Sequence, residues 1–168
     1  MLALVAFSAC SDPAGPESDA LRPIQTDQVQ YELVTTGQGW SAVIPFTFTN
    51  RTAEAVSLVN CNGSFTIVLE RKEGSTWVPR WGTISHLCLS PPLTVSPNHI
   101  LVDTLDLFAG PFGSNHYPQF ETVDPQGTYR LVLPGMVWSY DPDVQGFGTQ
   151  LPIAERVSND FLLIGGSS

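Results

Sequence analysis

The sequence carries little charge, and most of that charge is negative. Of its 168 residues only 14% are charged, and 16 acidic residues against 7 lysines and arginines give a net charge of −9. Ordinary globular domains contain roughly 25% charged residues. Because proteins bind nucleic acids largely through positive side chains that contact phosphate, this balance excludes DNA and RNA as expected partners.

The sequence pattern also shows no long helix and, beyond the N-terminal residues, no membrane-spanning segment. No stretch repeats apolar residues at helical spacing over three turns. After the first nine residues, no apolar run reaches the length of about 18 residues that crosses a bilayer. Glycine and proline number 14 each, which suits many turns and short strands.

The residue types that carry out catalysis or bind metals do not form a motif. His86, His99 and His116 lie in three separate segments without the close spacing of zinc ligands. No Gly-x-Ser-x-Gly sequence marks an activated serine. We therefore expect no metal, no cofactor and no catalytic residue, and a protein that is not an enzyme.

Alternating apolar residues are the strongest positive signal. Between residues 40 and 50, one face of the predicted strand carries Trp40, Ala42, Ile44, Phe46 and Phe48. A period of two is typical of a strand with one buried face. Similar segments are predicted at 28–35, 56–61, 64–71, 76–81, 99–108, 127–135 and 157–164.

These segments predict a single all-β domain, an antiparallel β-sandwich of seven to eight strands that spans residues 28–164. Residues 10–27 are polar and rich in proline, serine and aspartate, as in a flexible tether, and residues 165–168 are expected to fray. Pro79 predicts that its strand lies at a sheet edge. Gly74 is expected to adopt the left-handed conformation in a tight hairpin.

Aromatic residues are concentrated in two predicted loops, within 109–126 and 135–150. Loops at the ends of sandwiches often bind partners, and exposed aromatic side chains suit a protein, peptide or glycan. The alternative is that these rings cap the open ends of the core. The candidate binding residues are Phe112, Tyr117, Phe120, Trp138, Tyr140 and Phe147.

The N-terminal segment resembles the end of a bacterial lipoprotein signal peptide. Residues 1–9 are uncharged, and Phe7, Ser8 and Ala9 precede Cys10 in the manner of a lipobox. The resemblance implies that residues 1–9 are removed and that Cys10 is acylated, which would anchor the protein to a membrane of the cell envelope. The residue after the cysteine is Ser11 and not aspartate. By analogy with the sorting of bacterial lipoproteins, this favours the outer membrane.

Export would leave Cys61 and Cys88, and two cysteines in an exported domain are expected to form a disulfide. The closed loop of about 28 residues would contribute on the order of 3–4 kcal/mol in the chain-entropy description. The alternative is two separate buried thiols.

A short motif at the start of a late strand sharpens the fold. Asp124, Gly127 and Tyr129 resemble the tyrosine corner of immunoglobulin-like domains, in which the tyrosine hydroxyl bonds back to the preceding loop. The antibody position two residues after the tyrosine would be a cysteine, and here it is Leu131. The resemblance implies an immunoglobulin-like sandwich that lacks the inter-sheet disulfide of antibodies.

Two wider resemblances bear on function. TFTNRTAEAVSL (47–58) and EGSTWVP (73–79) are similar to segments of the BsuPI-type proteinase inhibitor family, itself a β-sandwich. Together with GTYRLVL (127–133) and VSNDFLL (157–163), the layout resembles small bacterial lipoproteins with an immunoglobulin-like domain. The first expectation is a non-enzymatic binding or scaffolding module at the cell envelope. The second is a proteinase inhibitor that presents a loop.

Overall fold

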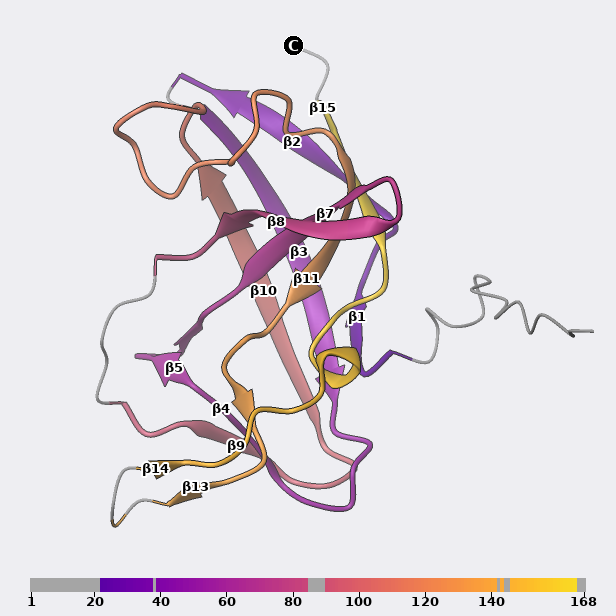
Figure 1. Cartoon of the computed structure of the whole chain (residues 1–168), viewed down its shortest axis with the longest axis vertical. Coiled ribbons are helices and arrows are strands. Elements are labelled where there is room, and N and C mark those ends of the chain that lie inside the picture. The colour runs from indigo at the N-terminus through magenta and orange to yellow at the C-terminus, as the bar shows by residue number, and fades with distance from the viewer. Residues whose placement is uncertain (1–21, 38, 85–89, 142, 144–145, 166–168) are drawn as a thin grey trace, which may run out of the picture.

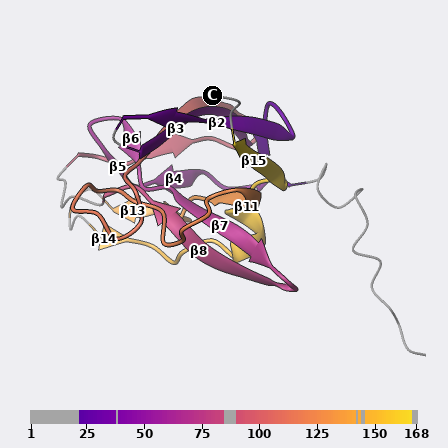
Figure 2. The ribbon, with the colours of Figure 1, turned by 90° about the horizontal axis from the view of Figure 1, so that it is seen from above.

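The structure, a computed structural model, describes residues 22–37, 39–84, 90–141, 143 and 146–165. Its regular elements are strands, with a 3₁₀ turn at Ile153–Glu155, so the prediction of an all-β fold is confirmed. The strands lie in two facing layers (Figures 1 and 2). Cys10, Cys88 and His86, the predicted signal peptide and most of the predicted tether lie outside the described residues.

The largest sheet has eight strands and contributes to both layers. β1, β3 and β10 belong to one layer, β7, β8, β11 and β15 to the other, and β2 pairs with both, as Figure 2 shows from above. The described residues contain fifteen strands in all, more than the predicted seven to eight, because many of the others are very short. The strands are β1 (Ile24–Thr26), β2 (Gln30–Thr36), β3 (Gly39–Thr49), β7 (Val68–Glu73), β8 (Thr76–Gly82), β10 (Ile100–Ala109), β11 (Gly127–Val132) and β15 (Phe161–Gly165).

The other strands are two or three residues long. The sequence pattern missed β9 and β12 to β14, because so short a segment shows no alternation that can be recognised. One three-stranded sheet has the order β12-β4-β9, and β5 with β6 and β13 with β14 form small hairpins. Their bounds are β4 (Val56–Leu58), β5 (Asn60–Cys61), β6 (Ser64–Phe65), β9 (Leu93–Val95), β12 (Met136–Val137), β13 (Tyr140–Asp141) and β14 (Gly146–Phe147).

β3 is the central strand, although it contains a proline. One edge of β3 pairs with β10 over ten residues, and the other edge pairs with β2 at the start of β3 and with β1 near its end. The backbone of Pro45 faces the second edge, where its carbonyl accepts a hydrogen bond from Asp27 N (3.2 Å), just beyond the end of β1. A proline nitrogen has no hydrogen to donate, so its place beside this gap leaves the ladder to β10 complete.

The change of partner along β2 joins the two layers. Its first half runs parallel to β15, with Tyr31 opposite Leu163, and its second half runs antiparallel to β3, with Val34 opposite Ser41. The sandwich, predicted to be antiparallel, therefore contains one parallel pair among its strands. A strand that crosses between layers pairs in opposite senses with its two neighbours because those neighbours run in opposite directions.

Side chains at this junction are tightly arranged. The ring of Tyr31 meets Phe161 edge to face, with centroids 5.4 Å apart. The Tyr31 hydroxyl donates to Asp27 Oδ1 (2.6 Å) and accepts from Gln28 N (3.0 Å). Burial, together with the neighbouring Asp27 carboxylate, raises the pKa of Tyr31 to about 12, so the phenol keeps its proton and remains a donor.

The core follows the predicted alternation with two corrections. In the predicted strand 28–35 the alternation places Val29 on the inward face with Tyr31 and Leu33, but Val29 precedes β2 and is exposed. Ile24 is fully buried within β1, although it lies in the predicted tether, so the ordered domain begins before residue 28. The period of two also places one set of residues in each of the predicted strands 28–35, 40–50, 127–135 and 157–164 on the inward face. The members of these sets that are buried are Tyr31, Leu33, Ala42, Ile44, Phe46, Phe48, Tyr129, Leu131, Leu133, Val157, Phe161 and Leu163. Trp40 packs against them while partly exposed.

The β7–β8 hairpin agrees with the sequence. Gly74 has a φ of +61° at the turn, and β8 lies at the end of the strand order, where a strand can hold Pro79. An irregularity between Leu69 and Glu70 shifts the register of the pair. The side chain of Trp81, beyond this shift, turns into the molecule and is buried.

A hydrogen bond of the kind expected in a tyrosine corner closes the loop before β11. The Tyr129 hydroxyl donates to the carbonyl of Pro125 (2.9 Å), and both residues are buried. Asp124 Oδ1 accepts from Gln126 N (3.0 Å), which closes the turn. Gly127 has a φ of +146°, and a Cβ there would lie 2.9 Å from Arg71 Nε, so the position requires glycine. Burial raises the pKa of Tyr129 to about 12, which keeps this donor protonated.

We predict that Tyr129→Phe lowers the free energy of unfolding by about 1–2 kcal/mol, because a buried carbonyl loses its partner. Urea unfolding of the purified domain measures this directly. Tyr117→Phe is the matched control, since that residue is exposed. Equal losses in the two variants would show that the corner hydrogen bond does not contribute to stability.

Candidate functional site

The loop between β10 and β11 is held in shape by hydrogen bonds at its base and within it. Gly110 N donates to the carbonyl of Pro118 (2.8 Å), and Gly113 N donates to Gln119 Oε1 (3.1 Å). Ser114 N donates to the carbonyl of Pro111 (3.0 Å). These contacts hold the segment from 110 to 119 as a closed structure in which the peptide bond before Pro118 is cis.

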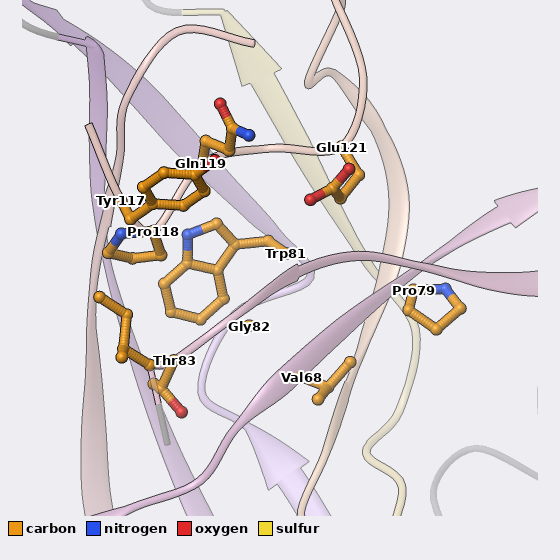
Figure 3. Close-up of a pocket in the computed structure, with 10 residues that line it drawn as sticks. Val68, Pro79, Trp81, Gly82, Thr83, Tyr117, Pro118, Gln119 and Glu121 are labelled. Atoms are coloured by element: carbon orange, nitrogen blue, oxygen red, sulfur yellow. The ribbon is translucent and has the colours of Figure 1, made fainter. Parts of the chain in front are cut away.

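A hollow of about 340 Å³ lies between this loop and β8. Figure 3 shows Trp81 in the middle of the group, with Tyr117 and Pro118 close to its ring and Thr83 and Val68 below it. The volume falls near the lower end of the range of roughly 300–1,000 Å³ found for small-ligand sites. The walls are mainly apolar, as is usual for such sites.

Trp81 is a fixed part of this wall. Its side chain is buried, and its Nε1 donates to the carbonyl of Phe108 (3.0 Å). Because Phe108 belongs to β10 and Trp81 to β8, this hydrogen bond links the two layers on the side opposite β2. The exposed apolar surface of the hollow is supplied instead by Tyr117, which is 63% exposed, and by Ile84.

Charged residues reinforce the rim. Arg80 makes two hydrogen bonds of 2.8 Å with the Glu73 carboxylate and donates to the carbonyl of Glu121 (3.1 Å). In return, Glu121 N donates to the carbonyl of Arg80 (2.7 Å). The hydrogen bonds from Arg80 hold the pKa of Glu73 below its ordinary value. Surface ion pairs contribute little stability, so the effect of this group is to fix Glu121 beside β8.

The structure separates the aromatic residues of the 109–126 loop. Phe112 and Tyr117 are exposed, as a binding role requires. Phe120 is fully buried, with its ring 6.3 Å from that of Trp40 and 6.2 Å from that of Tyr129. Its assignment as a binding residue is wrong, because it is part of the core and closes this end of the sandwich.

The other aromatic group lies at the opposite end of the molecule (Figure 1). Tyr140 and Phe147 face each other across the β13–β14 hairpin, with ring centroids 5.2 Å apart. Phe147 is half exposed, and Trp138 packs partly against the core. Trp138 also lines a hollow of about 460 Å³ beside the turn at Glu54. The six candidates therefore do not form one site.

Sequence reasoning missed most of the hollow beside Tyr117. Trp81 and Pro118 come from different strands and loops, and Ile84 follows β8 in a stretch with no periodicity. The preceding shift of register, which turns Trp81 inward, leaves no recognisable signal in the sequence. The sequence shows that Trp81 lies near Pro79 and that Tyr117 precedes Pro118. It does not show that these two segments meet, because that depends on the fold.

The described part of the chain offers no other obvious chemistry. It contains no group of three or more histidine, cysteine, aspartate or glutamate side chains that could hold a metal ion. None of the helical structure within the described residues has the length and apolar character needed to cross a bilayer. Comparison with protein-family models, curated proteins and solved structures found no match to this chain.

Proposed function

We propose that the protein is a lipid-anchored, non-enzymatic binding module of the cell envelope and that its binding site is the hollow beside Tyr117. The observation that carries this proposal is the combination of a defined apolar cavity with a braced, exposed aromatic residue at its mouth. Rigid aromatic side chains supply much contact area and lose little conformational entropy on binding.

The lining of the hollow favours a peptide or protein side chain as ligand. The apolar wall would take an aliphatic or aromatic group, while Thr83, Gln119 and Glu121 supply a few polar atoms that can orient it. Because the loop is already held by internal hydrogen bonds, it would need little reorganisation on binding.

We predict that Tyr117→Ala strongly lowers the affinity of the domain for most ligands that were selected against the unmodified protein. The measurement is selection from a library of displayed peptides and from a glycan array, followed by titration of the selected ligands. Phe147→Ala is the matched control, because that residue is similarly exposed at the opposite end. We expect selected ligands to bind this control as tightly as the unmodified protein.

Two results would contradict this assignment. Ligands that bind Tyr117→Ala and the unmodified domain equally would place the site elsewhere. Loss of binding in Phe147→Ala alone would favour the hairpin of β13 and β14.

Export to an oxidising compartment is supported by the surroundings of Cys61. We propose that Cys61 forms a disulfide, and the hairpin that holds it contacts the chain that follows Cys88. Asn62 N donates to Ser90 Oγ (3.1 Å), and Asn60 Nδ2 donates to the carbonyl of Pro91 (2.8 Å). We propose Cys88 as the partner. Stable disulfides are rare in the cytosol, so this pairing would agree with a lipoprotein signal that ends at Cys10.

We predict that mass spectrometry of the mature protein, isolated from membranes of a bacterial host, detects two modifications. Cys10 should be the acylated N-terminal residue, and a peptide containing Cys61 should be linked to one containing Cys88 before reduction. Cys10→Ala should lose the acyl chains and leave the membrane fraction. An unmodified Cys10, or two free thiols, would contradict the envelope assignment.

A proteinase inhibitor is the second candidate, and one observation favours it. The loop from 110 to 119 carries exposed Phe112 and Tyr117 while its base is fixed by hydrogen bonds. A rigid exposed loop suits an inhibitor, because little conformational entropy is lost when the loop binds the protease.

Assays of the purified domain against a panel of serine, cysteine and metalloproteinases separate the two candidates. An inhibitor should block at least one class with one-to-one stoichiometry, and Phe112→Ala or Tyr117→Ala should weaken the block. Intact activity of every protease at micromolar concentrations of the domain would leave the binding module as the function.

A further inference from the structure

We infer that the free edge of β10 is a second binding site, which takes an extended segment of another protein as an added strand. The segment would carry alternating apolar residues and at least one lysine or arginine. This site is separate from the hollow beside Tyr117, and the inference does not depend on the function proposed for that hollow.

Backbone hydrogen bonds identify which groups of β10 point outward. Just before the strand, the carbonyl of His99 accepts a hydrogen bond from Asn50 N (3.0 Å). The backbone N–H and C=O groups of the odd-numbered residues of β10 therefore point toward β3. The carbonyl of Phe108 instead accepts from Trp81 Nε1, on the side away from β3. Because backbone groups alternate along an antiparallel strand, the N–H and C=O groups of the even-numbered residues point to the free edge. These residues are Ile100, Val102, Thr104, Asp106 and Phe108.

Most of these outward groups lack a protein partner among the described residues. β10 pairs with β3 alone in that part of the chain. Two outward groups are occupied, since Thr104 N donates to Asp103 Oδ1 (2.8 Å) and Phe108 O accepts from Trp81. Ile100 and Val102 are 62% and 72% exposed. An edge of this length is a template for a further strand, because a strand supplies donors and acceptors at the matching spacing.

A cavity beside the edge has room for side chains of the added strand. A hollow of about 360 Å³ is bounded by Leu101, Val102 and Asp103 on β10 and by Phe65 and Leu93 on the facing side. Side chains of a strand alternate between its two faces. One set would therefore enter this mainly apolar hollow, and the other would lie beside the exposed side chains of Ile100, Val102 and Phe108.

Charge determines the class of partner. Asp103 and Asp106 lie on β10, and the whole chain has a net charge of −9. A cross-strand pair of opposite charge stabilises a sheet, whereas like charges opposite each other destabilise it. A second copy of this acidic chain is therefore disfavoured, and the acidic residues guard the edge against self-association. A basic residue opposite Asp106 would complement it.

The test uses a blocked synthetic peptide of alternating valine and lysine, with alternating valine and glutamate as the control peptide. Binding is measured by fluorescence anisotropy at several salt concentrations. We expect the lysine peptide to bind more tightly than the glutamate peptide, and we expect the difference to shrink with salt.

Val102→Pro is the decisive variant. It removes one outward N–H but no hydrogen bond to β3, so it should weaken binding about tenfold, as loss of one good hydrogen bond implies. Val102→Ala keeps the N–H and is the matched control, with an expected loss of less than about threefold. Asp106→Asn should weaken binding of the lysine peptide and reduce the salt dependence of that binding.

Amide hydrogen exchange in the unmodified protein provides a readout that does not depend on how well the proline variant folds. We expect the peptide to protect the outward amides of Ile100, Val102 and Asp106. Protection confined to residues around Tyr117, equal binding by Val102→Pro and Val102→Ala, or equal affinity for the two peptides would each overturn the inference. Formation of a dimer through this edge would overturn it as well.

Discussion

The fold depends on the pairing of β3 along both of its edges. One edge is occupied by β10 over its full length, while the other is divided between β1 and β2. This division makes room for Pro45 in a central strand and releases the first half of β2 to pair with β15. The two layers are therefore held together by continuous backbone hydrogen bonding on one side, in addition to the packing of the core.

Asn50 fixes the end of this arrangement. It is fully buried, and its Nδ2 donates to the carbonyls of Glu54 and Val95 at 2.8 Å each. Its Oδ1 accepts a hydrogen bond from Thr52 N (3.0 Å), and its backbone N donates to the backbone carbonyl of His99 (3.0 Å). A buried amide is costly unless its hydrogen bonds are made, and here one side chain joins the turn after β3 to the chain before β10.

Sequence reasoning predicted the fold more completely than the site, for a physical reason. Strands such as β3 and β11 have a wet face and a buried face, so alternation identifies both their existence and their inward side chains. Ile24 was missed because three residues of β1 show no period, and Phe120 was misassigned because composition cannot tell an exposed ring from a ring that caps the core. The parallel pair of β2 and β15 depends on contacts between residues about 130 positions apart, which no local pattern reports.

The same topology explains where surface suitable for binding occurs. Opposite the junction at β2, the layers are linked by the hydrogen bond of Trp81 to Phe108 between β8 and β10, and the outward edge of β10 has no strand beside it among the residues described. Two hollows lie on this side of the molecule, one lined by Trp81 and the other by Leu101. A sandwich that uses one strand to close one side leaves the other side open, and an open side with rigid walls is where a partner gains most contact for least reorganisation.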